Sequence, residues 1–206
     1  MKYPKLRELK EAVTAIIKGP CTTKYPYRPH SPAKRFRGKP VYSNDGCIAC
    51  GACALVCPAR AIEVSDTVDR KKAVRRMVLH LDECHYCGQC SALCTTKADN
   101  PPGIKHTTEF DLAGLDRRRM ISETGEKELA LCETCGDVIT AKVHLEWLAK
   151  RLGPLAFSNP TLFIASLKSL GFADDVASGA LGYATRSDRI KVLCAKCRRA
   201  STIEKY

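Results

Sequence analysis

The sequence predicts an α+β protein in four parts, and two observations lead to this prediction. Cysteines gather in two runs between residues 47 and 94, and again in two pairs at 132–135 and 194–197. Segments with helical spacing of apolar residues lie before the first run and between the two pairs. We therefore expect an N-terminal helix and arm at 1–40, a cysteine-rich core at 41–100, a linker at 101–128 and a mostly helical extension at 129–206.

The two cysteine runs have the same internal spacing, C-x2-C-x2-C-x3-C. They consist of Cys47, Cys50, Cys53 and Cys57, and of Cys84, Cys87, Cys90 and Cys94. This is the spacing of bacterial ferredoxins that hold two [4Fe–4S] clusters. Three cysteines at i, i+3 and i+6 can surround one cluster, whereas the fourth points away from them and ligates the other cluster. The core is therefore predicted to be a bacterial-type 2[4Fe–4S] ferredoxin.

This crossing of the fourth cysteines defines two ligand sets. The first cluster is assigned to Cys47, Cys50, Cys53 and Cys94, and the second cluster to Cys84, Cys87, Cys90 and Cys57. Gly51 and Gly88 occupy the same place in each run, where a residue without Cβ lets the backbone pass close to a cluster. Zinc sites and disulfides are the alternatives, but zinc sites do not call for four cysteines in each run.

The composition indicates a metal protein of a reducing compartment. Thirteen cysteines could form a secreted disulfide framework, but their clustering in C-x2-C units favours metal binding. We expect no transmembrane helix, since no stretch of about 18 apolar residues occurs, and no signal peptide.

The net charge is +12, and residues 1–40 hold 11 Lys and Arg against 2 Asp and Glu. An arm of this charge suits an acidic protein surface or an anionic lipid.

The N-terminal segment combines an amphipathic helix with a proline-rich arm. Apolar residues at helical spacing predict a helix over residues 5–18, which Gly19 and Pro20 end. This helix can pack on the protein's own core, in a partner's groove or on a membrane interface. Basic and aromatic residues alternate in the arm, but no recognised nucleic-acid module accompanies them, so we expect no nucleic acid as partner. Cys21 is interpreted as a free thiol.

Several further elements are predicted around and after the cysteine runs. Strands are expected at 61–64 and 74–81, which form a hairpin between the runs. His85, inside the second run, either faces solvent or tunes the second cluster. Helices are expected from Thr140 to Leu152 and from Asn159 to Gly171, with Asn159 as the N-cap of the latter.

The two C-x2-C pairs form a second predicted metal site, made of Cys132, Cys135, Cys194 and Cys197. Paired units of this kind give a tetrahedral four-cysteine zinc site. Mononuclear iron in a rubredoxin-like site is the alternative metal, and a redox-active dithiol is the alternative without metal. The expected role is structural, because the C-terminal segment has a small apolar core.

The chain resembles a known family at three places: Tyr25-Pro26, residues 36–40 (Phe-Arg-Gly-Lys-Pro), and residues 47–53. These are similar to the two-cluster ferredoxin-like subunits of the complex I and group 4 [NiFe]-hydrogenase superfamily. The pairs at 132–135 and 194–197 are similar to the C-terminal region of the formate hydrogenlyase iron–sulfur subunit. The resemblance implies docking of the N-terminal helix and arm on membrane-facing and hydrogenase-module subunits.

These observations predict a non-catalytic electron-relay subunit, because no catalytic residues are evident. The resemblance implies a peripheral complex on the cytoplasmic side of the membrane, with the hydrogenase small subunit and other iron–sulfur or membrane subunits as partners. Its electron donor would be ferredoxin or a formate or CO dehydrogenase module. The alternatives are a relay subunit of a complex I-type NADH or ferredoxin:quinone oxidoreductase, a free ferredoxin, and a nucleic-acid-binding metalloprotein.

Overall fold

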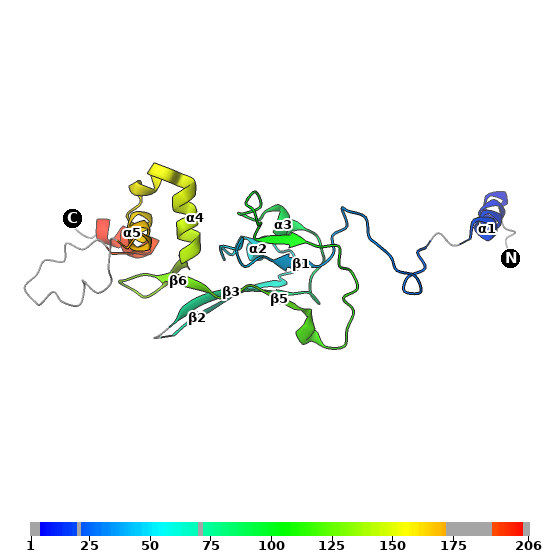
Figure 1. The fold of residues 1–206 in the computed structure, drawn as a ribbon, viewed down its shortest axis with the longest axis horizontal. Coiled ribbons are helices and arrows are strands. Elements are labelled where there is room, and N and C mark those ends of the chain that lie inside the picture. The colour runs from blue at the N-terminus through cyan, green and yellow to red at the C-terminus, as the bar shows by residue number, and fades with distance from the viewer. Residues whose placement is uncertain (1–4, 20–21, 70–71, 172–190, 204–206) are drawn as a thin grey trace, which may run out of the picture. The chain divides into compact units, whose positions relative to one another are not determined.

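The computed structural model describes residues 5–19, 22–69, 72–171 and 191–203, so Cys21 lies outside the described residues. The chain divides into two compact units, Met1–Phe36 and Arg37–Tyr206. Figure 1 shows the order of the elements along the chain. The structure mixes helices and strands, as the sequence predicts.

The first unit contains helix α1, Leu6–Lys18, which confirms the predicted N-terminal helix. Glu8 accepts a hydrogen bond from the Lys5 backbone N–H at 3.0 Å and so satisfies one of the free donors at the helix start. Gly19 adopts a positive φ of 71° and ends the helix. The helix buries none of its residues, and Leu6, Ile16 and Ile17 are each about four-fifths exposed or more, at 87%, 81% and 79%.

The second unit begins with a two-stranded sheet that closes the cysteine-rich core. Strand β1, Pro40–Tyr42, pairs antiparallel with β4, Ile104–His106. Between them in sequence lie two one-turn helices, α2 (Ala52–Leu55) and α3 (Gln89–Ala92), one in each cysteine run. Strand β4 lies in the segment expected to be a linker, and it brings residues after the second run beside those before the first.

A larger sheet continues from the core to the C-terminal part. The predicted hairpin is present as β2, Ile62–Val68, and β3, Ala73–His80. The sheet order is β2-β3-β6-β7, with β6 at Lys127–Leu131 and β7 at Val138–Ala141. The 3-10 helix η1, Arg117–Met120, leads into β5, Ile121–Glu123, which also pairs with β3. Both edges of β3 are therefore occupied, and its Met77 and Leu79 are among the most deeply buried side chains.

The C-terminal part packs helices beside β6 and β7 (Figure 1). These are α4 (Lys142–Leu152), the 3-10 helix η2 (Gly153–Ser158), α5 (Pro160–Ser169) and α6 (Ala195–Ile203). Asn159 caps α5 as predicted, since its Oδ1 accepts the Thr161 N–H at 3.0 Å. The predicted start of the preceding helix at Thr140 is wrong, because this residue lies in β7 opposite Ala130.

No helix among the described residues has the length and apolar character needed to cross a membrane.

Candidate metal centres

The first cavity in the core gathers cysteines from both runs. Its cysteine lining is Cys47, Cys50, Cys53 and Cys94. The first three come from the loop before α2 and from α2 itself, whereas Cys94 follows α3. The remaining lining is apolar or uncharged and includes Tyr42, Ile48, Met77 and Ile104. Four thiols around a cavity without carboxylates or cations suit the all-cysteine ligation of an iron–sulfur cluster.

The second cavity has the complementary set. Its cysteine lining is Cys57, Cys84, Cys87 and Cys90. Cys57 follows α2, whereas the other three surround the start of α3. Apolar residues such as Ile62 and Leu79 complete the wall, together with two histidines, His85 and His106. The structure therefore places the fourth cysteine of each run with three cysteines of the other run.

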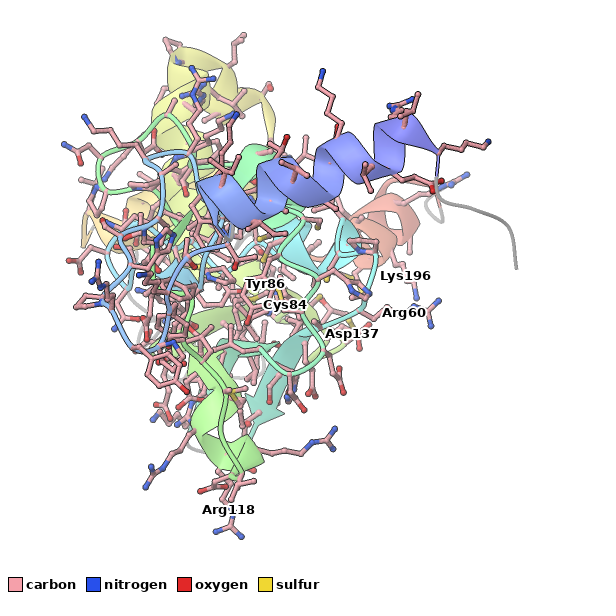
Figure 2. All side chains as sticks on the ribbon, turned by 90° about the vertical axis from the view of Figure 1, so that its right-hand side faces the viewer. Arg60, Cys84, Tyr86, Arg118, Asp137 and Lys196 are labelled. Carbon is pink, nitrogen blue, oxygen red and sulfur yellow. The ribbon has the colours of Figure 1, made fainter. Side chains whose placement is uncertain are left out.

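The two runs adopt the same unusual backbone conformations. Gly51 and Gly88, at the starts of α2 and α3, have φ of 80° and 82°, which a residue with Cβ adopts only with strain. Ala49 and Tyr86, each just before the second cysteine of its run, also have positive φ, at 49° and 51°. Figure 2 shows Tyr86 next to Cys84, whose Sγ accepts the Tyr86 N–H at 3.4 Å. The glycine spacing therefore reflects left-handed turns that wrap the chain around each cavity.

Burial favours the protonated thiol at Cys47, Cys53, Cys84 and Cys90, two cysteines of each cavity. It raises the pKa of the Cys53 thiol to about 11 and that of Cys90 to about 11. The pKa values of Cys47 and Cys84 are raised by the same cause. A thiolate is the metal ligand, so iron must supply the positive charge that displaces these protons. Cluster binding in both cavities is therefore expected to release protons.

Hydroxyl groups approach the sulfurs of the first cavity. The Tyr42 hydroxyl lies 3.6 Å from the Cys53 Sγ, and the Thr95 Oγ1 lies 3.2 Å from the Cys50 Sγ. Both can donate to a thiolate. The buried Thr96 donates to the Gly46 carbonyl at 2.9 Å and accepts the Gly103 N–H at 3.0 Å, and its Oγ1 also lies 3.4 Å from the Cys94 Sγ. Thr96 thus joins the two loops that flank this cavity, and because its proton goes to Gly46, Tyr42 and Thr95 are the hydroxyls available to donate to the sulfurs.

Replacing Gly46 by alanine is expected to disrupt the loop before Cys47. A Cβ there would lie 2.2 Å from the Pro101 carbonyl oxygen, far inside van der Waals contact. The clash should cost about 3 kcal/mol of unfolding free energy and lower the occupancy of the first cluster. Gly114→Ala is the matched control, because its Cβ would meet nothing within 4 Å. Anaerobic denaturant unfolding and iron analysis should separate them, and equal behaviour of both variants would contradict this packing.

Arg37 and His85 flank the second cavity in different ways. Arg37 donates from Nη1 to the Cys87 carbonyl and lies against Gly88, where a Cβ would be 3.0 Å from the Arg37 Cδ. The Arg37 side chain therefore contacts the backbone of the second run at Cys87 and Gly88 and stabilises its conformation. His85 is exposed, in agreement with the solvent-facing interpretation of this residue. His106 was not predicted from the sequence as a site residue.

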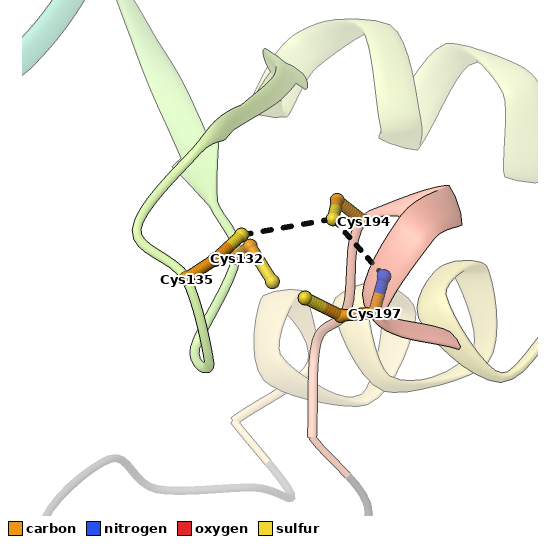
Figure 3. Close-up of side chains that lie close together, drawn as sticks. All are labelled: Cys132, Cys135, Cys194 and Cys197. Atoms are coloured by element: carbon orange, nitrogen blue, oxygen red, sulfur yellow. Dashed lines mark hydrogen bonds between the residues drawn. The ribbon is translucent and has the colours of Figure 1, made fainter. Parts of the chain in front are cut away.

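The four remaining predicted ligands converge in the C-terminal part (Figure 3). The Sγ atoms of Cys132, Cys135, Cys194 and Cys197 all lie within 4.8 Å of one another. Cys132 and Cys135 come from the turn after β6, and the other pair from the start of α6. The Cys135 and Cys194 sulfurs are 3.7 Å apart, close to the edge of about 3.8 Å expected for four sulfurs around one zinc ion. The donor set and its spacing therefore fit a single tetrahedral metal ion.

The charges of these sulfurs also favour a cation. Burial raises the pKa of Cys132, but backbone N–H groups, including those of Cys135 and Cys194, outweigh burial and lower it to about 6. For Cys135 the Asp137 N–H lowers the pKa, but the neighbouring sulfurs outweigh it and raise the value to about 12. The Cys132 thiol thus ionises readily, and its sulfur opposes ionisation of the Cys135 thiol. A divalent ion would remove this conflict and hold all four as thiolates.

Glu133 links the two halves of this four-cysteine centre. Its backbone N–H donates to the Val192 carbonyl at 2.9 Å, and its carboxylate accepts the Val192 N–H at 3.2 Å. The same carboxylate pairs with Lys168 of α5 at 2.7 Å. The segment before α6 is therefore fixed to the turn after β6 from both sides. This explains how two cysteine pairs so far apart in sequence meet in the fold.

Sequence reasoning missed Tyr42, Arg37 and His106 beside the cavities. A signal for His106 exists in the alternation of β4, where Ile104 is buried, Lys105 is exposed and His106 returns to the inner face. That alternation is readable only once the three residues are known to form a strand, and the strand depends on its pairing with β1. Arg37 and Tyr42 likewise reach the site through this pairing.

The class of protein follows from these sites and from comparison with known families. Residues 46–98 match the family model described as a 4Fe-4S dicluster domain. This segment contains all eight cysteines of the two runs. The chain therefore contains a two-cluster iron–sulfur domain, and the resemblance drawn from its motifs is confirmed.

Its similarity to individual proteins covers part of the chain. It is 41% identical over 105 residues to the NAD(P)H-quinone oxidoreductase subunit I of Synechococcus sp. (strain WH7803), which covers 49% of this chain and 45% of that protein. It is 42% identical over 53 residues to formate hydrogenlyase subunit 6 of Escherichia coli (strain K12), which covers 25% of this chain and 29% of that protein. The chain thus spans less than half the length of these curated relatives.

Among solved structures, it is similar to a chain of the membrane-bound sulfane sulfur reductase, an archaeal respiratory membrane complex. The identity is 25% and the TM-score 0.38, over 58% of this chain and 61% of that chain.

Proposed function

We propose that this protein relays single electrons through two [4Fe–4S] clusters. The first cluster is held by Cys47, Cys50, Cys53 and Cys94, and the second by Cys57, Cys84, Cys87 and Cys90. The observation that carries the proposal is that each cavity is lined by four cysteines, three from one run and one from the other. A bacterial-type ferredoxin core holds its clusters in this way. The dicluster domain match over residues 46–98 supports the same assignment.

The chain's own residues position the cofactors and exclude water. When bound, the clusters supply the one-electron chemistry. The left-handed turns at Gly51 and Gly88 direct the backbone around them. Ile48, Met77 and Leu79 keep the surroundings apolar and buried, which holds water away and sets the local dielectric. The Tyr42 and Thr95 hydroxyls are placed to donate to cysteine sulfurs of the first cluster.

The four-cysteine centre is assigned a structural zinc ion, with mononuclear iron as the alternative metal. It joins the turn after β6 to the start of α6 and thereby fixes the C-terminal helices to the sheet (Figure 3). The small buried cluster of Ala130, Leu145, Ala156 and Leu162 gives this part little apolar core of its own. A metal can supply the missing folding free energy.

The complex in which the protein acts is proposed to be a membrane-associated group 4 hydrogenase similar to formate hydrogenlyase. The four-cysteine centre favours this assignment, together with the match to formate hydrogenlyase subunit 6. The partners would be the hydrogenase small subunit and adjacent iron–sulfur or membrane subunits, with ferredoxin or a formate or CO dehydrogenase module as donor. The longer match to a quinone oxidoreductase subunit favours a second candidate, a complex I-type relay subunit.

Purification of the tagged protein from its native cell tests this proposal. We expect about eight irons per chain, two reducible [4Fe–4S] signals in EPR, and co-purifying subunits with hydrogen-evolving activity. Donor-dependent quinone reduction without hydrogen evolution would instead support the complex I-type candidate. A stable monomer with eight irons would indicate a free ferredoxin, and zinc at every cysteine site with salt-sensitive nucleic-acid binding would overturn the relay function.

Deleting residues 1–36 is expected to release the protein from its complex while both clusters remain. These residues form a separate unit, whereas the cavities lie in residues 37–206. We propose that the basic arm binds partner subunits and that α1 lies at the cytoplasmic membrane surface or in a partner's groove. Co-purification and iron content measure the two effects. Loss of iron on deletion would show that the arm is needed for the cluster domain.

A matched variant separates the helix from the arm. Serine at Leu6, Ile16 and Ile17 removes the three most exposed of the large apolar side chains of α1 and keeps every basic residue. If α1 anchors the protein, this variant should dissociate from its membranes or complex like the deletion. Unchanged association would assign the docking to the arm alone.

A further inference from the structure

The residue that follows the last cysteine differs between the two runs. The first run continues with Pro58, which has no hydrogen-bond donor. The second run continues with Thr95, which places a hydroxyl at the corresponding position. The Thr95 Oγ1 lies 3.2 Å from the Sγ of Cys50, a cysteine of the first cavity. This departure of the second run from the first therefore gives the first cavity a hydroxyl beside one of its sulfurs.

A second hydroxyl reaches the same cavity from β1. The Tyr42 hydroxyl lies 3.6 Å from the Cys53 Sγ, and only 9% of the surface of Tyr42 is exposed. A thiolate that binds iron has no proton to give, so the hydroxyl must be the donor in both pairs. The first cavity therefore offers its sulfurs two side-chain donors, one from β1 and one from the segment after α3.

The second cavity lacks this feature. Among the residues that the structure describes, no serine, threonine or tyrosine lines it. The Ser91 hydroxyl, in α3, donates to the Gly88 carbonyl at 3.0 Å. Of the two histidines in the wall, His85 is exposed, and the Nδ1 of His106 is hydrogen-bonded to the Gly38 carbonyl oxygen at 2.7 Å. The two cavities thus differ in the hydroxyl donors that face their sulfurs.

The backbone donors do not produce a similar difference. In the first run the Ala49 N–H donates to the Cys47 sulfur. In the second run the Tyr86 N–H donates to the Cys84 sulfur at 3.4 Å. These donors occupy the same place in each run, two residues after its first cysteine. Their effects on the two clusters are therefore expected to be similar.

The arginines beside the two runs are also similar in number. Arg75 donates to the Ala49 carbonyl at 3.2 Å, and Arg37 donates to the Cys87 carbonyl. Asp66 pairs with Arg75 at 2.6 Å and offsets its charge, whereas Arg37 is exposed and water screens its charge. Neither arginine therefore gives one cavity a strong electrostatic advantage, and the hydroxyls remain as the main asymmetry.

We propose that the Tyr42 and Thr95 hydroxyls raise the reduction potential of the first cluster above that of the second. This inference rests on the proposed ligand sets of the two clusters. Hydrogen bonds to cysteine sulfurs strengthen as negative charge increases, so these hydroxyls stabilise the reduced state more than the oxidised state. A single electron delivered by the donor of the complex then resides on the first cluster, and electrons that enter at the second cluster pass to the first.

Three variants and a control test this order of potentials. Tyr42→Phe and Thr95→Val each remove one hydroxyl and nearly preserve the side-chain shape. Each should change the reduction equilibrium of the first cluster by about fivefold, which lowers its potential by about 40 mV, and leave the second unchanged. Thr95→Ser keeps the hydroxyl and should keep the wild-type potential. Ser91→Ala is the control, because its hydroxyl donates to a carbonyl and should affect neither cluster.

EPR-monitored redox titration of the intact protein gives both potentials. The Cys57→Ala variant, which lacks a ligand of the second cluster, identifies the signal of the first. ENDOR spectra of the wild-type protein add a readout independent of the potentials. The reduced first cluster should couple to an exchangeable proton that is lost in Thr95→Val and kept in Thr95→Ser.

Several results would overturn the proposal. These are a higher potential for the second cluster, unchanged potentials in both Tyr42→Phe and Thr95→Val, equal shifts of both clusters, and a shift of the same size in Ser91→Ala. A wild-type protein without two reducible clusters would instead refute the proposed function.

Discussion

Replacing Cys57 by alanine is expected to remove the second cluster, although Cys57 belongs to the first cysteine run. Its sulfur lines the cavity formed by Cys84, Cys87 and Cys90. The variant should bind about four irons in place of about eight, and EPR of the reduced protein should retain only the signal of the first cluster. The change is large because the variant offers only three thiolates for the four corners of a cubane, and no other cysteine lines this cavity.

Cys94→Ala is the matched counterpart, since it lies in the second run but lines the first cavity. It should leave the second cluster and remove the first. Cys57→Ala should therefore keep only the EPR signal of the first cluster, and Cys94→Ala only that of the second. If each variant lost the cluster of its own run instead, the crossed ligand sets would be wrong. Mössbauer spectra of the two variants would show whether a three-iron cluster remains.

Replacing Cys132 by alanine is expected to empty the four-cysteine centre and unfold the C-terminal helices. Cys132 is the most buried of the four ligands, with 3% of its surface exposed, and backbone N–H groups stabilise its thiolate. Zinc should fall from about one ion per chain to none while iron stays at about eight. Thermal unfolding should show a separate early transition for the C-terminal part, because structural zinc supplies several kcal/mol of folding free energy.

Cys21→Ala serves as the control for this variant, since Cys21 belongs to none of the predicted ligand sets. It should leave zinc, iron and thermal unfolding unchanged. A strong chelator applied to the wild-type protein should reproduce the effect of Cys132→Ala. Two results would contradict the structural role: an unchanged unfolding profile after metal loss, or iron in place of zinc with a reversible redox signal.

The cysteine runs made the core predictable, because their spacing encodes local geometry. The hairpin between the runs and the Asn159 cap follow from short-range rules, and the structure has both. The four-cysteine centre was also predictable, since a C-x2-C unit brings two sulfurs to one turn whatever lies between the units. The metals themselves and the ligand sets stay predictions.

The rest could not be predicted because it depends on pairing between distant residues. Strand β4 has three residues and one buried apolar side chain, which is too weak a pattern to recognise alone. It becomes a strand because β1 lies beside it, and β5 and β6 likewise form on β3. Residues 138–141 join β6 as a strand although they adjoin a helical pattern, because Val138 and Ile139 fit a sheet.

The exchange of cysteines between the two runs also affects how the protein assembles. A cluster in either cavity links residues before and after the hairpin and acts as a covalent crosslink of the chain. Closing such a loop removes about 4 kcal/mol of conformational entropy from the unfolded chain. The cluster that forms first carries the entropic cost of closing the loop. The second cluster then forms in a loop that is already closed. Insertion of the two cofactors should therefore be cooperative, and partly loaded chains should be rare at equilibrium.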